Sequence, residues 1–418
     1  MRKLKDSGIE WIGKIPENWK VQRAKTLFSQ RLTKGNQDIT LLAATQKYGM
    51  LPQSEVEGVV QVKENADLQQ FRTVHKDDYV ISLRSFQGGF EFSQYEGVCS
   101  PAYQVFYNIK PVYHPYYRLM FKSDGFIKKM NSLTVGIRDG KNIQYDDFAN
   151  SLIPVPPLDE QEHIASYLDR KCSQIDAIIA KQQQIIEKLK EYKLSVITEA
   201  VTKGLDPNVP MKDSEVEWIG MVPEEWRISR IKYICEFNPG TKKANHDVVS
   251  YAPMECVKDG YLIKKEIRHD GISTGLTSFE EGDIIMAKVT PCFENGNIAI
   301  AKDLVNKFGV GSSELFVFRA KKVNTQWLFY FLRNSIFKKL AEATMTGTGG
   351  LKRVSPSFIR DFSLALPPEK EQRRIIEYLD KKCMEIDRVI KYKQSAVEKL
   401  GQYKKSLIYE VVTGKMEV

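Results

Sequence analysis

The chain repeats itself in two widely separated blocks, and this repeat limits the folds that it can adopt. Residues 6–28 (DSGIEWIGKIPENWKVQRAKTLF) return at 213–235, with 11 of 23 positions identical. Residues 156–202 return at 367–413, with 24 of 47 positions identical. Self-similarity at a fixed period means that one structural unit is built twice. The sequence therefore predicts the order domain, long helix, domain, long helix.

The second repeated block has the periodicity of a coiled-coil helix. After Pro156 and Pro157, which suit a first helical turn, apolar residues recur in alternating steps of four and three. Gly204, Pro207 and Pro210 end the first helix. A helix of about 44 residues spans roughly 65 Å and cannot bury its stripe alone. We expect the two copies to pair antiparallel, which brings the C-terminus near the N-terminus. The predicted seam of the first helix comprises Ile164, Leu168, Cys172, Ile175, Ile179, Gln182, Ile186, Leu189, Lys193, Val196 and Ala200.

Polar residues interrupt this seam at equivalent positions of the two copies, Gln182 with Lys393 and Lys193 with Lys404. They could set the register of the pair at a cost in stability. Alternatively, the lysines could lie at the edge of the seam with their amines in water. We favour the second interpretation for the lysines. The equivalent pair Cys172 and Cys383 indicates small apolar packing residues.

The segments between the repeats, 29–155 and 236–366, have diverged far more than the repeats themselves. Each contains strand-like stretches in its middle, then a helical stretch at 115–133 or 325–343, then a glycine-rich basic loop. We predict the class α+β: two strand-rich domains separated by two long helices that pair as an antiparallel coiled coil, with pseudo-two-fold symmetry. The predicted boundaries are 1–155 for domain one, 156–204 for the first helix, 205–366 for domain two with a linker at 205–212, and 367–418 for the second helix.

Composition and charge indicate a globular protein with an anionic partner. The 418 residues are 42% hydrophobic and 28% charged, and the sequence lacks an apolar run of 18 residues. Six scattered cysteines without a CxxC pair, and an N-terminus without an apolar signal region, lead us to expect a cytoplasmic protein. The net charge is +9, and about two thirds of the surplus lies outside the long helices. A polyanion such as DNA fits this surplus.

The order of motifs resembles a known family. W-I-G-x-x-P-E-x-W opens each domain at 11–19 and 218–226, and P-P-x-x-E-Q opens each helix at 156–161 and 367–372. This set resembles the specificity (S) subunits of type I restriction–modification systems. The resemblance implies that each variable domain is a target recognition domain that reads one half of a bipartite, asymmetric site in double-stranded DNA, while the helices act as a spacer. It also implies two methyltransferase (M) subunits that hold S-adenosylmethionine, restriction (R) subunits that use ATP and Mg²⁺, and no cofactor in this chain.

Candidate DNA-contacting residues are polar or basic side chains beside turns, because such side chains reach phosphates and base edges. Arg84 and Lys288 are the strongest pair, since both copies keep a basic residue at the same turn. The candidates in domain one are Gln46, Lys47, Tyr48, Arg84, Ser85, Gln87, Arg138 and Lys141. The candidates in domain two are Lys242, Lys243, Lys288, Thr290, Asn295, Asn297, Lys352 and Arg353. Trp11, Trp19, Trp218 and Trp226 could stack on bases, but their recurrence at both domain entrances favours packing.

Motifs for catalysis are missing from the sequence. A DNA methylase would carry [ND]PP[YF], and the nearest match, Asn238-Pro239-Gly240, lacks the second proline and the aromatic residue. Residues 136–142 are one residue short of a P-loop, and the five histidines lack metal-ligand spacing. We therefore expect a non-catalytic recognition subunit without a metal site. A self-sufficient DNA-modifying enzyme with an unrecognised site and a coiled-coil protein scaffold remain alternatives.

Overall fold

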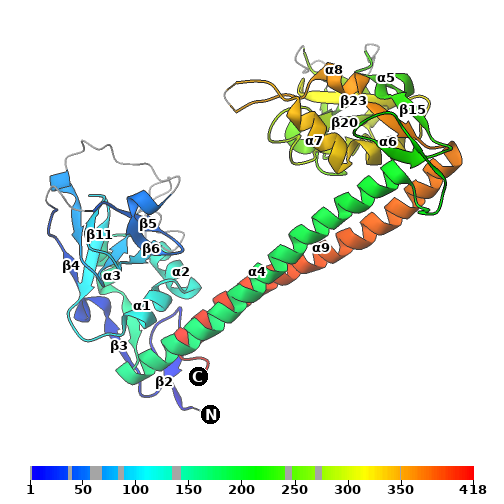
Figure 1. The fold of residues 1–418 in the computed structure, drawn as a ribbon. Helices are drawn as coiled ribbons and strands as arrows, with labels where there is room; N and C mark the ends of the chain where they lie inside the picture. The colour runs from blue at the N-terminus through cyan, green and yellow to red at the C-terminus, as the bar shows by residue number, and fades with distance from the viewer. Residues whose placement is uncertain are drawn as a thin grey trace. The chain divides into compact units, whose positions relative to one another are not determined.

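The structure is a computed structural model, and it describes residues 2–35, 40–56, 68–82, 89–133, 143–240, 247–268, 275–348 and 350–418. The chain divides into two compact units, each of which is described by itself. Unit 1 is Met1–Gln183 with Ser395–Val418, and unit 2 is Gln184–Gln394. Both boundaries fall inside the long helices α4 (Leu158–Lys203) and α9 (Glu369–Val412), so each unit holds one globular domain and parts of both helices (Figure 1).

Unit 1 is built on a four-stranded antiparallel sheet with the strand order β4-β11-β8-β9. Two-stranded sheets β1-β2, β5-β6, β10-β7 and β12-β3 surround it. The strands are β1 (Leu4–Asp6), β2 (Lys14–Pro16), β3 (Lys20–Arg23), β4 (Phe28–Arg31), β5 (Leu42–Thr45), β6 (Gly49–Pro52), β7 (Arg72–Val74), β8 (Tyr79–Ile81), β9 (Phe90–Phe92), β10 (Gly97–Cys99), β11 (Gln104–Asn108) and β12 (Leu152–Val155). The helices are α1 (His114–Phe121), α2 (Asp124–Leu133) and α3 (Tyr145–Asn150).

The core of unit 1 is aromatic. Phe28 of β4 makes edge contacts with Tyr79 of β8 and Phe106 of β11, at ring-centroid distances of 5.7 and 5.6 Å. Phe106 also packs against Phe148 of α3 at 4.6 Å, and all four side chains are buried. Edge-on aromatic pairs of this kind stabilise a core beyond the area that they bury. The sheet and the short helices therefore share one core.

Unit 2 repeats the main sheet with the order β16-β23-β20-β21, strand for strand equivalent to that of unit 1. Its second sheet, β18-β17-β22-β19, has four strands, and β17 runs parallel to β22. The strands are β13 (Met211–Asp213), β14 (Met221–Pro223), β15 (Arg227–Arg230), β16 (Cys235–Phe237), β17 (Val248–Ala252), β18 (Lys265–Arg268), β19 (Thr277–Glu280), β20 (Ile284–Ala287), β21 (Ile298–Ile300), β22 (Phe308–Gly311), β23 (Leu315–Ala320) and β24 (Ser363–Leu366). The helices are α5 (Ile231–Ile234), α6 (Thr325–Leu332), α7 (Ser335–Ala343) and α8 (Pro356–Asp361).

The helical stretches predicted at 115–133 and 325–343 are each broken into two helices. In unit 2 the break lies at Asn334, whose side chain accepts a hydrogen bond from the backbone N–H of Phe337 and so caps α7. In unit 1 the break lies at Ser123, whose hydroxyl donates to the carbonyl of Met120. Side chains of this type compete with the helical backbone for hydrogen bonds, and periodicity alone does not reveal the break.

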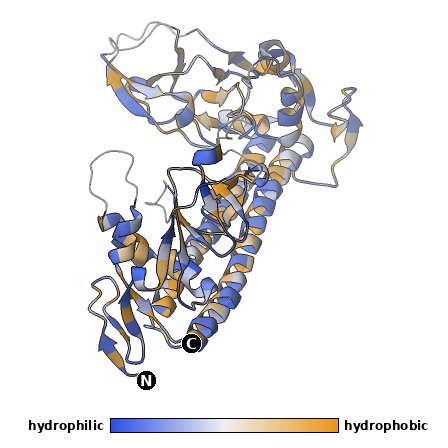
Figure 2. Ribbon diagram, turned by 90° about the vertical axis from the view of Figure 1, so that its left-hand side faces the viewer, coloured by the Kyte–Doolittle hydropathy of each residue, from blue (hydrophilic) through white to orange (hydrophobic). Residues whose placement is uncertain are grey.

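The long helices pair antiparallel in each unit, and α9 ends at Val412, before the predicted end at residue 418. In unit 1, Leu168 near the start of α4 shares a core with Leu407 and Val411 near the end of α9. In unit 2, Ile197 near the end of α4 shares a core with Ile375 near the start of α9. Figure 2 shows apolar and polar residues alternating along these helices, as a seam requires. The predicted α+β class with antiparallel long helices is confirmed, and Cys172 and Cys383 are buried as expected.

The seam lysines have partners that the sequence did not predict. Lys404 Nζ lies 2.7 and 2.6 Å from the carboxylate oxygens of Asp176, and Lys193 Nζ lies 2.8 Å from both oxygens of Asp387. Each amine therefore binds an acid of the other helix instead of water alone. The aspartates are more than half exposed, so the lysines do lie at the edge of the seam. Sequence spacing along one helix did not reveal these partners, because they belong to the other helix.

The two repeated motifs bind each other. Trp19 donates from Nε1 to Oε2 of Glu160 at 2.9 Å, and Gln161 accepts from the backbone N–H of Tyr113 at 2.9 Å. In unit 2, Trp226 donates to Glu371 at 3.0 Å, and Gln372 accepts from Asn324 N–H at 2.9 Å. Trp19 and Trp226 are fully buried, so their packing role is confirmed. The tryptophan of each domain entrance is thus fixed to the E-Q pair that opens the helix.

The two termini meet within unit 1, as antiparallel helices predict. Tyr409 near the end of α9 donates from its hydroxyl to the backbone carbonyl of Trp11 at 2.6 Å. Tyr116 donates to the carbonyl of Val412 at 2.8 Å. Among the described residues, no helix has the length and apolarity needed to cross a membrane.

Candidate nucleic-acid interface

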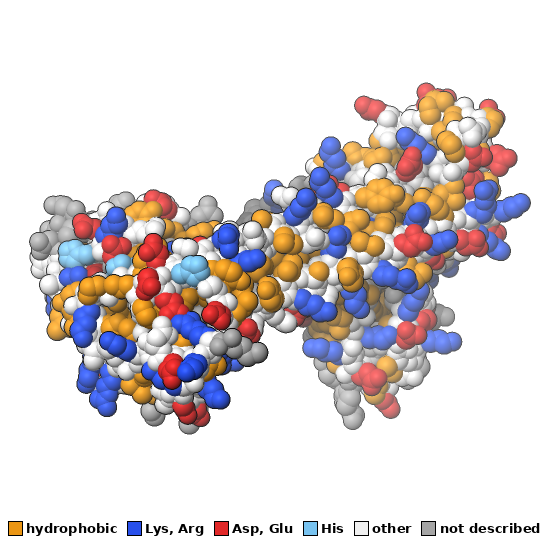
Figure 3. Space-filling view, turned by 90° about the horizontal axis from the view of Figure 1, so that it is seen from below, with side chains coloured by type: hydrophobic (Ala, Val, Ile, Leu, Met, Phe, Trp, Pro, Cys, Tyr) orange, Lys and Arg blue, Asp and Glu red, His pale blue; other side chains and the backbone are white. Residues whose placement is uncertain are grey.

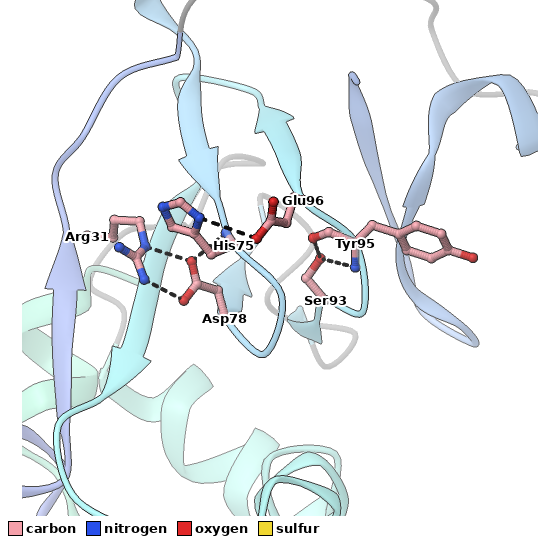
Figure 4. Close-up of polar contacts among 6 residues, drawn as sticks. All are labelled: Arg31, His75, Asp78, Ser93, Tyr95 and Glu96. Atoms are coloured by element: carbon pink, nitrogen blue, oxygen red, sulfur yellow. Dashed lines mark hydrogen bonds and ion pairs between the residues drawn. The ribbon is translucent and has the colours of Figure 1, made fainter. Parts of the chain in front are cut away.

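A buried aspartate fixes the strand that leads to the strongest candidate loop of domain one. Asp78, just before β8, accepts two hydrogen bonds from the guanidinium of Arg31, at 2.7 and 2.9 Å, and one from the backbone N–H of His75 at 2.8 Å. Figure 4 shows the arginine and the aspartate facing each other, with His75 Nδ1 3.8 Å from Glu96. Charge-assisted, bidentate pairing is strong and directional. It therefore orients β8.

Domain two builds the same anchor with an arginine from another strand. Asp283, just before β20, binds Arg319 through two hydrogen bonds of 2.8 Å and accepts the backbone N–H of Glu280 at 2.7 Å. Arg319 lies on β23, whereas Arg31 lies on β4, which is the equivalent of β16. Asp283 raises the pKa of the Arg319 guanidinium by hydrogen bonding. The aspartate therefore occupies the same position in both domains, and only the strand that supplies its arginine differs.

Several predicted contacts lie outside the described residues. They are Arg84, Ser85, Gln87, Arg138, Lys141, Lys242 and Lys243. For these seven the assignment as DNA contacts stays a prediction.

The candidates Gln46, Lys47 and Tyr48 form the exposed turn between β5 and β6. Thr45 closes this turn, because its Oγ1 donates to Gly49 O at 2.8 Å and accepts from Tyr48 N–H at 3.1 Å. Lys47 Nζ lies 4.9 Å from the centroid of the Tyr48 ring, and hydrogen bonding to Tyr48 raises the pKa of the lysine. Tyr48 is 65% exposed. An exposed aromatic ring beside a cation suits contact with a nucleic acid.

In domain two the structure brings two separate candidate loops together. Val289 forms an isolated bridge with Arg353, and Val354 N–H donates to Lys288 O at 2.9 Å. Thr290 is buried, and its Oγ1 donates to Gly350 O at 2.7 Å and accepts from Lys352 N–H at 3.0 Å. Thr290 therefore holds the loops together, whereas Lys352 and Arg353 remain exposed on them.

Two of these cations are positioned by groups of the β22–β23 turn. Arg353 binds the carboxylate of Glu314 at 2.9 and 3.0 Å, and this hydrogen bonding lowers the pKa of Glu314. Lys288 donates from Nζ to Ser313 O at 2.6 Å. Both side chains have partners in the protein, and Lys352 is exposed beside them on the same paired loops.

Asn295 and Asn297 follow the segment 288–290 and line a cavity of about 270 Å³ in unit 2. The cavity lies between the domain and the helices α4 and α9, with Lys193, Arg333 and Asp387 among its lining residues. The remaining residues of its lining are Lys190, Leu194, Asp259, Met286, Phe293, Gly296, Ile298, Leu332, Lys338 and Ile390. Asn295 N–H donates to Pro291 O at 2.9 Å and Ala287 N–H donates to Asn297 O at 3.0 Å, so backbone hydrogen bonds join both asparagines to the residues that flank the segment 288–290.

Sequence reasoning missed one hairpin in domain two. Val257 and Leu262 form a bridge, and Lys258 N–H donates to Tyr261 O at 3.0 Å across Asp259-Gly260. The hairpin follows β17, as the Lys47–Tyr48 turn follows β5, and Tyr261 is 58% exposed. The Asp-Gly dipeptide is a hairpin signal that could have identified it. It adds Lys258 and Tyr261 to the candidates.

Other titratable groups have structural surroundings. Burial lowers the pKa of His114, whose Nδ1 lies 3.1 Å from the hydroxyl of Tyr79, and it raises the pKa of Cys99 to about 12. All six cysteines are free thiols. Within the part of the chain that the structure describes, no three His, Cys, Asp or Glu side chains are grouped as metal ligands. His246 and His269 lie outside that part.

Comparison with known proteins gives one family. The model of the type I restriction modification DNA specificity domain matches the chain twice, at residues 16–191 and 223–397. The EcoEI specificity subunit of Escherichia coli is 30% identical over 199 residues, which cover 46% of this chain and 33% of that one. The EcoDI specificity subunit of Escherichia coli is 22% identical over 429 residues, covering 97% and 90%. The chain thus spans about a third of the EcoEI subunit that it matches.

Solved structures share the fold. One chain, from work on complex assembly and conformational transition of the type I R-M system, superposes with a TM-score of 0.70 at 13% identity, covering 96% of this chain and 99% of that one. The HsdS subunit from Thermoanaerobacter tengcongensis gives a TM-score of 0.51 at 14% identity, covering 96% and 98%.

Proposed function

The chain belongs to the family of type I restriction modification DNA specificity domains, and we propose that it selects the DNA sequence for a type I restriction–modification complex. This proposal rests on the family model, which matches the chain twice, once in each copy of the internal repeat. Each copy contains one strand-rich domain and one long helix. The chain would therefore bring two reading domains to one DNA molecule.

The two domains are expected to read different half-sites. Domain one presents Lys47 and Tyr48 on a tight turn, whereas domain two presents Lys288, Lys352 and Arg353 on paired loops. Two identical recognition domains related by a two-fold axis would bind a palindromic site. Unlike readers favour a bipartite, asymmetric site with an unread spacer.

Methyltransferase subunits are the proposed partners of the long helices. In unit 1, Ile178 and Tyr403 are exposed near the Asp176–Lys404 ion pair. In unit 2 their equivalents, Val389 and Tyr192, are exposed near Asp387–Lys193. By the heptad spacing all four lie on the same flank of the seam. Apolar side chains, interspersed with Lys and Arg, are visible along the helix pair in Figure 3. Two equivalent patches fit two copies of one partner.

The chain itself is proposed to be non-catalytic. The M subunits would hold S-adenosylmethionine, and the R subunits would use ATP and Mg²⁺ for translocation and cleavage. The chain would contribute the choice of site and the attachment of these subunits. Alone, it should bind DNA weakly, with an affinity that falls steeply with salt because lysine and arginine displace counterions from phosphates.

A footprint of the chain reconstituted with its M subunits tests the recognition role. We expect two protected patches that flank an open spacer, and protection that sharpens when M is added to the chain. Absence of protection at any DNA sequence would favour the protein scaffold. Methyl transfer or cleavage by the purified chain alone, with S-adenosylmethionine, ATP and Mg²⁺, would favour a self-sufficient enzyme.

Tyr403→Asp and Tyr192→Asp test the attachment of M separately. Each change places a charge in one apolar patch, so each should reduce the number of bound M subunits from two to one in light scattering. Gln183→Asp is the matched control, since Gln183 is also exposed on α4 but lies outside the apolar flank. Retention of two M subunits by both tyrosine variants would contradict the assignment.

A further inference from the structure

Each globular domain packs against the C-terminal end of one long helix. The two contacts, called junctions here, carry different residues at positions that correspond in the two copies of the repeat. Junction 1, in unit 1, joins α2 to the end of α9. Junction 2, in unit 2, joins α7 to the end of α4. At the repeat offset, Gly125 of α2 corresponds to Ile336 of α7, and Tyr409 of α9 corresponds to Thr198 of α4. Each set of equivalent positions holds one small and one large residue, with the roles exchanged: Gly125 with Tyr409 in junction 1, and Ile336 with Thr198 in junction 2.

Junction 1 places a large helix residue over a glycine. Tyr409 donates to the carbonyl of Trp11 at 2.6 Å, and Lys415 lies over its ring at 4.5 Å. A Cβ on Gly125 would lie 2.5 Å from the Tyr409 ring and 2.8 Å from the Trp11 ring. Gly125 lies inside α2 without a positive φ, so the backbone does not require glycine there. Glycine weakens a helix, and the close approach of the Tyr409 and Trp11 rings accounts for its presence here.

Junction 2 places a small helix residue over the start of α7. Thr198 Oγ1 accepts the backbone N–H of Ser335 at 2.9 Å and lies 3.0 Å from the Ser335 hydroxyl. These bonds satisfy one of the free N–H groups at the helix start. Ile336 follows Ser335 in the position that Gly125 holds in junction 1. By equivalence with junction 1, where a Cβ at position 125 would meet the Tyr409 ring, a tyrosine at position 198 would overlap the Ile336 side chain.

We propose that these junctions decide which helix end each domain accepts. Domain one accepts the end of the second helix, and domain two accepts the end of the first. Pairing of first halves from two copies of the chain would bring Thr198 to Gly125, which leaves a void and removes the donor to the Trp11 carbonyl. Pairing of second halves would bring Tyr409 to Ile336, where the side chains overlap. Both faults destabilise packed interfaces.

The seam ion pairs cannot make this selection. Lys193 and Lys404 are equivalent, as are Asp176 and Asp387, so a first helix paired with another first helix would keep Asp176 opposite Lys193. The junctions therefore determine whether a first half pairs with a second half or with another first half. This inference concerns assembly and does not depend on the proposed DNA recognition.

Hydrogen exchange of the full chain, read by mass spectrometry at the ends of α4 and α9, tests the proposal. In T198Y/Y409T the composition is unchanged but both junctions are mismatched, and we expect exchange at both helix ends to accelerate by about tenfold or more. In G125I/T198Y/I336G/Y409T both junctions are exchanged completely, and we expect rates within about threefold of the parent chain. Parent-like exchange in T198Y/Y409T, or continued fast exchange in the quadruple variant, would overturn the proposal.

A second set of variants separates size matching from general damage to α2. G125I alone should accelerate exchange at the end of α9, and Y409T in the same chain should restore most of the protection. I336G is the matched control and should leave the end of α9 unchanged, because it alters only junction 2. If G125I/Y409T exchanges as fast as G125I, the isoleucine harms α2 by itself and size matching is refuted.

Discussion

Domain one and domain two are held by the same contacts but offer different groups to solvent. Trp19 with Glu160 and Trp226 with Glu371 fix the two domains to their helices in the same way. The β5–β6 turn is short in domain one, whereas the equivalent connection in domain two contains the Lys258–Tyr261 hairpin. Residues that face the repeated helix are retained, and residues on loops are free to change. This is the division expected when a scaffold carries variable readers.

The buried aspartates sharpen this comparison. Asp78 and Asp283 hold the same place before equivalent strands, yet Arg31 and Arg319 reach them from strands that are not equivalent. What the two domains share is a buried acid with a bidentate arginine. Low identity between the domains therefore coexists with the same anchoring geometry.

The largest expected effect comes from the entrance tryptophans. Trp19→Ala should lower the free energy of unfolding by about 3 to 5 kcal/mol, because it leaves a cavity and removes the hydrogen bond to Glu160. Trp226→Ala should have an effect of the same size in unit 2, since both rings are fully buried with the same partner. Urea unfolding with hydrogen exchange of each unit measures both. Trp→Phe is the control, as it removes the hydrogen bond but keeps much of the volume. Effects that differ by more than about 2 kcal/mol would break the equivalence.

The next effect concerns the buried aspartates. Asp78→Ala should cost about 3 kcal/mol, at the low end for a broken buried pair, because the Arg31 side chain is 20% exposed. The loss should loosen β8 and weaken binding to one half-site, and Asp283→Ala should weaken binding to the other. Competition binding with DNA altered in one half-site at a time gives the readout. Arg31→Ala combined with Asp78→Ala is the control, since it leaves no unpaired charge and should recover part of the stability.

The repeat made the fold predictable, whereas details inside the domains were not. Periodicity predicted α4 and α9 within a few residues, because a heptad seam is a long signal. The breaks at Ser123 and Asn334 depend on single side chains that cap or compete with a helix, so they were missed. The partners of Lys193 and Lys404 lie on the other helix and cannot be read along one stretch of sequence.

A smaller effect is expected at the candidate DNA contacts. Lys47→Ala should weaken DNA binding by about 1 kcal/mol and lower the slope of affinity against salt by about one. Lys352→Ala should do the same for domain two, because both lysines are exposed on turns. Binding titrations over a range of salt concentrations, with each half-site altered in turn, measure this. Loss of sequence choice in both halves from either single change would contradict separate readers.

The sequence predicted several of the candidate residues, but it did not predict which of their loops lie together. Loop position and charge pointed to Lys288 and to Lys352 with Arg353 separately, and only the fold shows that their loops pair. Thr290 was chosen as a reader, yet its hydroxyl is used between the loops. The Lys258–Tyr261 hairpin was missed because its Asp-Gly turn was not weighed as a hairpin signal.

The smallest expected effect belongs to the seam lysines. Lys193→Met and Lys404→Met should each change the free energy of unfolding by about 0.5 kcal/mol or less, because Asp387 and Asp176 are more than half exposed. Double-mutant cycles with Asp387→Asn and Asp176→Asn isolate each pair, and high salt should remove the difference. Replacing both lysines should leave the hydrogen-exchange pattern at the helix ends unchanged, since the junctions fix the register. If that double variant loses protection at both ends, the lysines specify the register after all, and the junctions would be its consequence.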